Sequence, residues 1–162
     1  MLSHEYPETV IEILDDSIVF SDEILRAMDR FATSRPWHGL LPVRQEKFRR
    51  LNHDVAKTCQ IREPNLEFQA LGKGDSVMSY YSGREHRIVM VGKLSVVTYL
   101  HEFAHALGCD EKAACRWSIN LFRKSFPRQY SKLIHVGHTL VHPTEIAEKI
   151  NRRLGIKSTR TN

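Results

Sequence analysis

The chain has 162 residues, of which 41% are hydrophobic and 27% are charged. This length and composition are typical of one compact domain with a sizeable core. No stretch approaches the roughly 18 apolar residues of a membrane span, so we expect no membrane partner. Three cysteines are also too few, and odd in number, for a secreted disulfide scaffold.

The first residues lack the basic and apolar regions of a signal peptide, so we expect the protein in the cytoplasm. Charge is uneven along the chain. Residues 112–162 carry 11 Lys and Arg against 2 Asp and Glu, whereas residues 1–111 carry 13 against 17. A basic C-terminal third could meet nucleic acid or another acidic partner. A solvated helix face followed by a basic tail explains the same charges, and we favour this simpler interpretation.

The N-terminal third predicts two helices. Ser21 is a typical N-cap because two acidic residues follow it, and apolar residues then recur at helical spacing to about Ser34. A second helix should begin near Pro42 or Val43, since proline suits the first helical turn. Its apolar stripe consists of Phe48, Leu51, Val55 and Cys59.

The apolar period then changes to that of strands. Leu66, Phe68 and Ala70 alternate with polar residues, and residues 72–75 predict a turn. Residues 77–81 predict a second strand, and residues 87–91 predict a third. The third strand is apolar on both faces, so we expect it to be well covered.

Two further helices should follow in close succession. The first spans residues 95–107 and ends at Gly108, a typical C-terminal glycine. Asp110 should cap the second, which runs from Glu111 to about residue 123 or 124. Residues 130–142 show no clear period. A last helix should run from about residue 143 to residue 154.

We therefore predict an α+β fold with a small antiparallel or mixed sheet of about three strands and several helices. Residues 1–155 form a single predicted domain, with a helical part at about 1–62, a core of sheet and helix at about 63–127, and a basic helical part at about 128–155. Residues 156–162 should form a flexible tail.

The strongest motif is the H-E-x-x-H run formed by His101, Glu102 and His105. Residues four apart lie on one helical face, so both imidazoles can bind one zinc ion. Glu102 can then accept a proton from an attacking water and pass it to a leaving amine. A purely structural role would bury two histidines and a glutamate on an apolar helix at a cost of several kcal/mol, which favours the metal hypothesis.

A zinc site needs a third protein ligand, and several residues compete for that role. We favour Glu111, because the turn at Gly108 should fold its helix back toward the histidines. Asp110 comes next, although its position suits an N-cap better. The other candidates are His135, His138 and His142, with Cys109 or Cys115 as a thiolate alternative. Thiolates are more typical of structural zinc sites.

The run of residues 101–108 resembles the active-site helix of gluzincin-type metallopeptidases. Residues 111–122 resemble the second helix of ImmA/IrrE-like proteins, in which a glutamate supplies the third zinc ligand, and that glutamate falls on Glu111. The resemblance also includes a strand just before the zinc helix, which would be residues 87–91 in this chain. The resemblance covers about residues 76–127. The spacing of His105, Gly108 and Glu111 is also similar to that of metzincins, whose third zinc ligand falls at the position of Glu111.

The resemblance implies a minimal zincin-like fold and a way of holding substrate. A peptide would add as a strand to a free sheet edge beside the zinc, offered by residues 77–81 or 87–91. A His, Tyr or Arg near the ion would stabilise the transition state, and the candidates are His138 and Tyr130.

The leading functional hypothesis is a cytoplasmic zinc endopeptidase of narrow specificity that cleaves a protein partner, with Glu102 as general base. Proteins of the resembled family often act on a regulator such as a repressor. A second hypothesis is a DNA-associated protease similar to the SprT type, which the basic C-terminal third favours. A third is a zincin fold that binds without catalysis, which the intact Glu102 disfavours.

Overall fold

A computed structural model of the chain describes residues 13–71, 78–137 and 139–155. The helices in these ranges are α2 (Asp22–Thr33), α3 (Leu41–Thr58), α4 (Val96–Ala106), α5 (Glu111–Ser125), α6 (Pro127–Tyr130) and α7 (Pro143–Arg153). The strands are β1 (Asn65–Gln69), β2 (Tyr80–Ser82), β3 (Arg87–Val91), β4 (Ile134–Val136) and β5 (Thr139–Val141). The predicted α+β class is confirmed.

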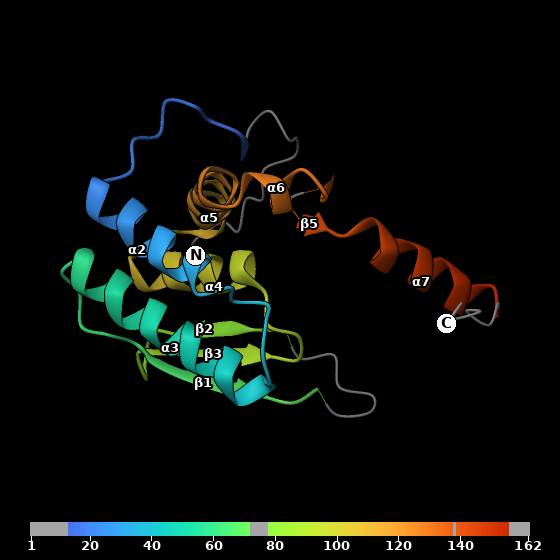
Figure 1. Ribbon diagram of the computed structural model, residues 1–162, viewed down its shortest axis with the longest axis horizontal. Coiled ribbons are helices and arrows are strands. Elements are labelled where there is room, and N and C mark those ends of the chain that lie inside the picture. The colour runs from blue at the N-terminus through green and yellow to red at the C-terminus, as the bar shows by residue number, and fades with distance from the viewer. Residues whose placement is uncertain (1–12, 72–77, 138, 156–162) are drawn as a thin grey trace.

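The main sheet has three strands in the order β1-β3-β2 (Figure 1). β3 pairs with β1 in parallel and with β2 in antiparallel orientation, so of the two predicted alternatives, antiparallel or mixed, the sheet is mixed. β3 has the predicted bounds, and its middle residues Ile88, Val89 and Met90 are buried. An apolar strand in the centre of a sheet is covered on both faces and hydrogen-bonded on both edges, as its sequence indicates.

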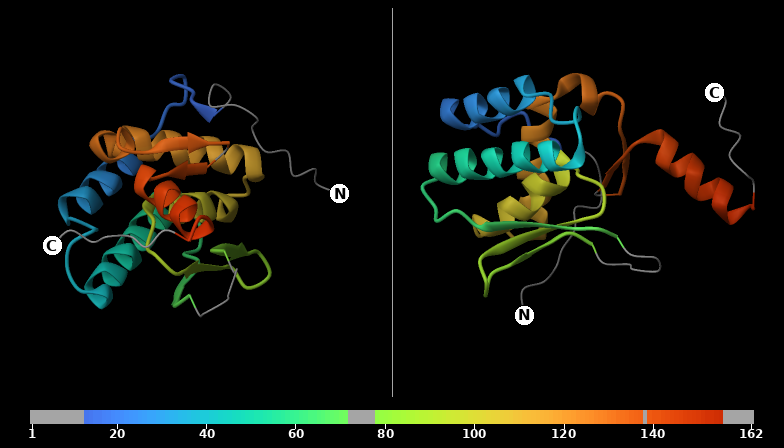
Figure 2. Two further views of the ribbon diagram at one scale, coloured as in Figure 1. Left: turned by 90° about the vertical axis from the view of Figure 1, so that its right-hand side faces the viewer. Right: turned by 60° about the horizontal axis from the view of Figure 1, so that its bottom comes forward.

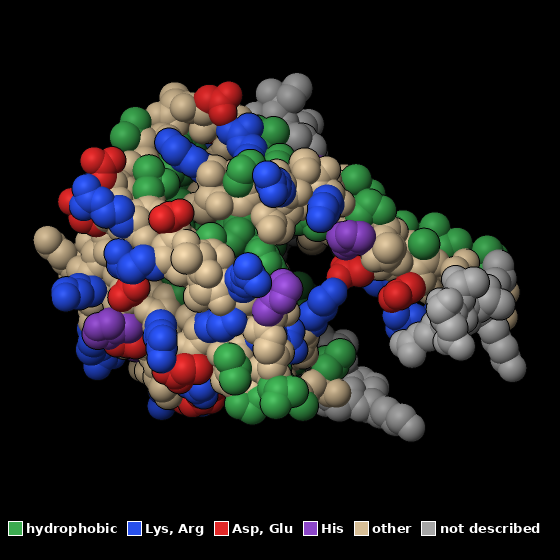
Figure 3. All heavy atoms as spheres, viewed as in Figure 1, with side chains coloured by type: hydrophobic (Ala, Val, Ile, Leu, Met, Phe, Trp, Pro, Cys, Tyr) green, Lys and Arg blue, Asp and Glu red, His purple; other side chains and the backbone are tan. Residues whose placement is uncertain are grey.

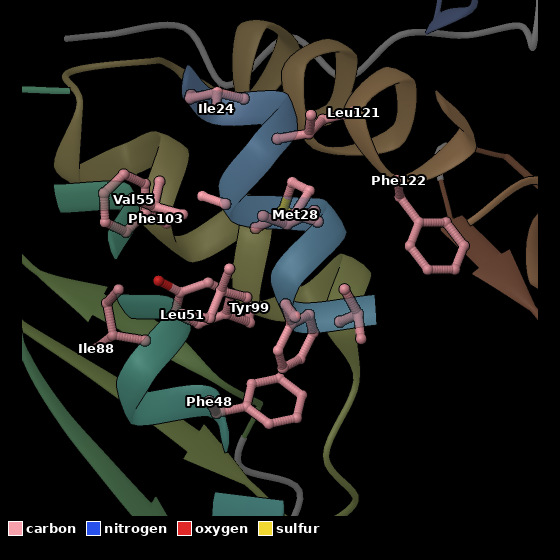
Figure 4. Close-up of a cluster of buried hydrophobic side chains, with 14 of the residues drawn as sticks. Ile24, Met28, Phe48, Leu51, Val55, Ile88, Tyr99, Phe103, Leu121 and Phe122 are labelled. Carbon is pink, nitrogen blue, oxygen red and sulfur yellow. The ribbon is translucent and has the colours of Figure 1, made fainter. Parts of the chain in front are cut away.

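The core lies between the sheet and the helices that cover it (Figure 4). α3 contacts β1, α4 contacts β2 and β3, and α2 packs on α3 and α5. α4 contributes the large buried side chains Tyr99 and Phe103. The Tyr99 hydroxyl donates to Asn52 Oδ1 at 3.0 Å, and Asn52 Nδ2 donates to the Pro64 carbonyl at 2.8 Å. This buried chain of hydrogen bonds fixes α4 relative to α3 and to the entry into β1.

The connection between α4 and α5 follows the local signals in the sequence. Ser95 caps α4 by accepting a hydrogen bond from the Thr98 N–H. Gly108 has φ +91°, the Cys109 N–H donates to the Ala104 carbonyl, and the Gly108 N–H donates to the His105 carbonyl. These two bonds are those of a Schellman motif, which needs the left-handed conformation that glycine adopts without strain. The predicted end of this helix at Gly108 is confirmed.

The N-terminal helix and its cap agree with the sequence analysis, and two other segments differ from it. α2 begins after the predicted N-cap Ser21. Residues 130–142, which lack a clear period, include the antiparallel hairpin β4–β5, so the part predicted as basic and helical at about 128–155 contains two strands between α6 and α7. β2 begins three residues later than predicted. Residues 72–77, 138 and 156–162 lie outside the described residues, together with the predicted turn and tail.

α7 extends away from the rest of the molecule (Figures 1 and 2). It has no buried residue, and the ion pair between Lys93 and Glu145 links its first turn to the loop before α4. Among the described residues, no helix has the length and apolar character that a membrane crossing requires.

A short N-terminal segment, residues 13–16, is held against α5. Asn120 is buried, donates through Nδ2 to the Ile13 carbonyl at 2.7 Å, and accepts a hydrogen bond from the Asp15 N–H at 3.1 Å. Arg116 pairs with Asp15 and Arg123 pairs with Asp16. The segment therefore supports the outer side of the helix that carries Glu111.

Replacing Asn120 by Ala should lower the free energy of unfolding by about 1–3 kcal/mol, because the substitution leaves the part-buried Asp15 N–H and the buried Ile13 carbonyl without their partner. Urea denaturation followed by circular dichroism would measure the change. Asn151→Ala on the exposed helix α7 is the matched control and should change stability by less than about 0.5 kcal/mol. Equal stability of the two variants would contradict the role assigned to Asn120.

Candidate metal centre and cleft

The candidate site lies where α4 packs against α5. His101 and His105 are one turn apart on the exposed side of α4, while Tyr99 and Phe103 on its other side lie in the core. Glu111 is the first residue of α5, directly after the turn at Gly108. The three side chains are about one-fifth exposed.

The polar atoms of these three residues converge on one point. His101 Nε2 lies 3.2 Å from His105 Nε2 and 3.2 Å from Glu111 Oε2. His105 Nε2 lies 3.0 Å from Glu111 Oε1. Each pair is therefore in mutual contact, so the three groups form a compact triangle of nitrogen and oxygen atoms.

The protonation of His105 follows from the contact of its other nitrogen. His105 Nδ1 lies 2.9 Å from the carbonyl oxygen of Cys109. A carbonyl can only accept, so Nδ1 carries the proton, and in the neutral ring Nε2 presents a lone pair. That lone pair faces His101 Nε2 and the Glu111 carboxylate. The arrangement needs positive charge at its centre, supplied either by protonated imidazole or by a metal ion.

The triangle matches the dimensions of a tetrahedral zinc site. Zinc binds imidazole nitrogen and carboxylate oxygen at about 2.0–2.1 Å, and tetrahedral bonds of that length separate neighbouring ligand atoms by about 3.3 Å. The observed separations are 3.0–3.2 Å. Two imidazoles and one carboxylate also form a ligand set that leaves a fourth position for water or substrate. The residues present therefore fit the metal.

Cys115 offers a second possible grouping. One ligand atom from each of His101, Glu111 and Cys115 can be chosen so that all lie within 4.8 Å of one another. However, Cys115 Sγ lies 3.8 Å from Nδ1 of His101, on the opposite side of the ring from Nε2. Burial, followed by the charges of Glu111 and Glu102, raises the pKa of the Cys115 thiol to about 11. His101 Nε2, His105 Nε2 and the Glu111 carboxylate lie within 3.0–3.2 Å of one another, so we favour the grouping through Nε2.

Glu102 lies beside this centre and is only 8% exposed. Burial is the main cause that raises the pKa of its carboxyl to about 8, and the negative charge of Glu111 adds to it. A hydrogen bond from the backbone of Tyr81 acts in the opposite direction. Strand β2 is thus connected directly to the glutamate of the H-E-x-x-H motif.

A cleft of about 610 Å³ opens over the centre. Its described lining includes residues of β2, α4, α5 and β5, so the small hairpin forms one wall. Tyr80 and Tyr81 line it from β2, which is an edge strand of the main sheet. β3 pairs on both sides, so the prediction that residues 87–91 could offer a free edge is wrong, and β2 is the edge beside the site.

The other predicted site residues have different surroundings. The Asp110 carboxylate caps α5 by accepting a hydrogen bond from the Ala113 N–H at 2.8 Å. The Tyr130 hydroxyl contacts His135 Nε2 at 2.8 Å, and His142 caps α7. None of these residues belongs to the described lining of the cleft. His138 lies outside the described residues, and its role stays a prediction.

Two arginines of the basic C-terminal third are paired within the protein. Arg116 and Arg123 pair with the carboxylates of the N-terminal segment. Over the face made by α2 and α3, Lys and Arg side chains alternate with acidic ones (Figure 3). These observations give the nucleic-acid hypothesis no additional support.

Three contacts at the site were missed by the sequence analysis. The Cys109 carbonyl orients His105, and Cys115 lies beside His101. The second had a detectable signal, because Cys115 follows Glu111 by four residues and must share its helical face. The hydrogen bond from the Tyr81 backbone to Glu102 had none, because it joins a strand and a helix 21 positions apart.

Comparisons of the chain with protein-family models, with curated proteins and with solved structures found no match. The interpretation of the site therefore depends on its own geometry and chemistry.

Proposed function

We propose that the protein is a zinc-dependent peptidase of the zincin type, which acts in the cytoplasm on a protein partner. The observation that carries this proposal is the convergence of His101 Nε2, His105 Nε2 and the Glu111 carboxylate within 3.0–3.2 Å. A buried glutamate and a cleft beside a sheet edge accompany it.

Each residue of the centre has a distinct role in this proposal. His101, His105 and Glu111 would hold the ion and leave one position open. A zinc ion bound there would polarise the scissile carbonyl and make water a stronger nucleophile at neutral pH. A cation held beside Glu102 would lower the pKa of its carboxyl from about 8, and the carboxylate would then accept the proton of the attacking water and return it to the leaving amine. The Tyr81 N–H would orient the Glu102 carboxylate for both transfers.

The substrate would bind as an extended peptide alongside β2. An edge strand presents main-chain donors and acceptors that can pair with another strand. β2 lines the cleft next to Glu102, and β5 lines it as well, so a peptide between them would pass over the centre. A protein substrate would need an unfolded segment to enter, which favours narrow specificity.

The arrangement of elements supports the resemblance to gluzincins and to ImmA/IrrE-like proteins. A buried strand precedes the zinc helix, and a second helix begins with the glutamate that faces both histidines. The resemblance also suggests a regulatory protein as partner. A protein with an accessible extended segment is the partner class that the cleft and the edge of β2 fit.

Glu111→Ala should abolish stoichiometric zinc binding, because it removes one of three ligands. Asp110→Ala is the matched control, since it loses an N-cap worth about 1 kcal/mol and leaves the three ligand atoms in place. Elemental analysis of the purified proteins, reloaded with zinc and then dialysed, would measure the metal content. Retention of zinc by Glu111→Ala and its loss from Asp110→Ala would move the third ligand to Asp110.

Glu102→Gln should reduce peptide cleavage by at least about 100-fold while zinc content stays unchanged, because an amide cannot accept the proton of the attacking water. Mass spectrometry of a diverse peptide library incubated with the zinc-loaded protein would detect new termini. Glu148→Gln on α7 is a control for the same chemical change at an exposed position. A zinc-loaded wild-type protein that cleaves no peptide, or a fully active Glu102→Gln variant, would contradict the proposal.

A further inference from the structure

The ring of His101 is contacted at both nitrogens by one helix. Nε2 faces Glu111 at 3.2 Å, and Nδ1 faces the sulfur of Cys115 at 3.8 Å. Glu111 and Cys115 are four residues apart, so consecutive turns of α5 present them on the same face. Cys115 is 3% exposed and lies in the interface between α4 and α5.

His105 shows what such a second contact does. Its Nδ1 donates to the Cys109 carbonyl, which directs the Nε2 lone pair toward the centre. Histidines that bind metals generally donate their other ring N–H to an acceptor, which fixes the ring orientation and the tautomer. At His101, the sulfur of Cys115 occupies the position of that acceptor.

We propose that Cys115 is a positioning residue, whose sulfur accepts a hydrogen bond from Nδ1–H of His101 and thereby directs Nε2 to the metal. This inference rests on the proposed zinc site. It assigns Cys115 a place outside the ligand set, in contrast to the alternative grouping of Cys115 with His101 and Glu111 as direct ligands.

The surroundings explain why sulfur is suited to this position. Ligand atoms of Cys115 and Glu111 lie within 4.8 Å of each other, and Glu102 lines the same cleft. A carboxylate at the same place would add a third negative charge to a largely buried site, at a high cost in desolvation and repulsion. A thiol is neutral, fills the apolar interface, and still offers a weak acceptor.

The test compares Cys115→Val with Cys115→Ser by zinc competition against a chromophoric chelator. Valine fills the same space without an acceptor and should weaken zinc binding by about 10-fold or more, whereas serine restores an acceptor and should recover most of that loss. Cys109→Ser is the matched control and should bind zinc as the wild type does, because Cys109 contacts His105 through its backbone carbonyl.

Cobalt absorption spectra separate the remaining outcomes. With Cys115 outside the ligand set, the Co²⁺ protein lacks a sulfur-to-metal charge-transfer band, and the spectrum keeps its shape in Cys115→Ser. A charge-transfer band that Cys115→Ser removes would make Cys115 a ligand and overturn the positioning role. Zinc affinity unchanged in Cys115→Val would overturn this inference alone. Failure of the wild-type protein to bind either metal would overturn the proposed function as well.

Discussion

The packing of α4 against α5 across the turn at Gly108 is the constraint on which the rest of the site depends. The turn reverses the chain within three residues, so the first residue of α5 meets the last two turns of α4. Phe103 stacks on Trp117 across this interface, with ring centroids 6.3 Å apart, and Tyr99 anchors α4 to α3 through Asn52. Because the inner face of α4 is held in this way, the outer face has little freedom, and the two imidazoles point at the carboxylate of Glu111.

The same packing creates an electrostatic problem that a cation would solve. Glu111 lies close enough to Glu102 for its negative charge to raise the pKa of the Glu102 carboxyl. In its neutral form, His105 presents the Nε2 lone pair to the same centre. Burying unpaired carboxylates costs several kcal/mol, and such groups persist in proteins when a partner of opposite charge offsets that cost. A divalent ion at the centre would neutralise Glu111 and supply the positive charge that all of these groups lack.

The cleft that leads to the candidate metal centre is lined by elements that are far from the centre in the sequence. β2 provides the free sheet edge and the backbone hydrogen bond to Glu102, and the hairpin β4–β5 forms part of the cleft lining opposite α4. The interface between α4 and α5 would be an open surface without β2 and this hairpin. The N-terminal segment supports α5 from its other side through Asn120. The centre is thus local in sequence, whereas the cleft is assembled from distant segments.

The sequence by itself determined the elements whose signals are local. Capping at Ser21 and Asp110, the glycine at 108 and the apolar run of β3 each act within a few residues, so their helices and strands could be predicted. Only the tertiary structure decided the order of the strands, the central place of β3, the hairpin wall, and the contacts of Tyr81 and Cys115 with the site. These features depend on pairing and packing between segments that are distant in the chain, and such contacts leave no periodic signal because their partners have no fixed separation in sequence.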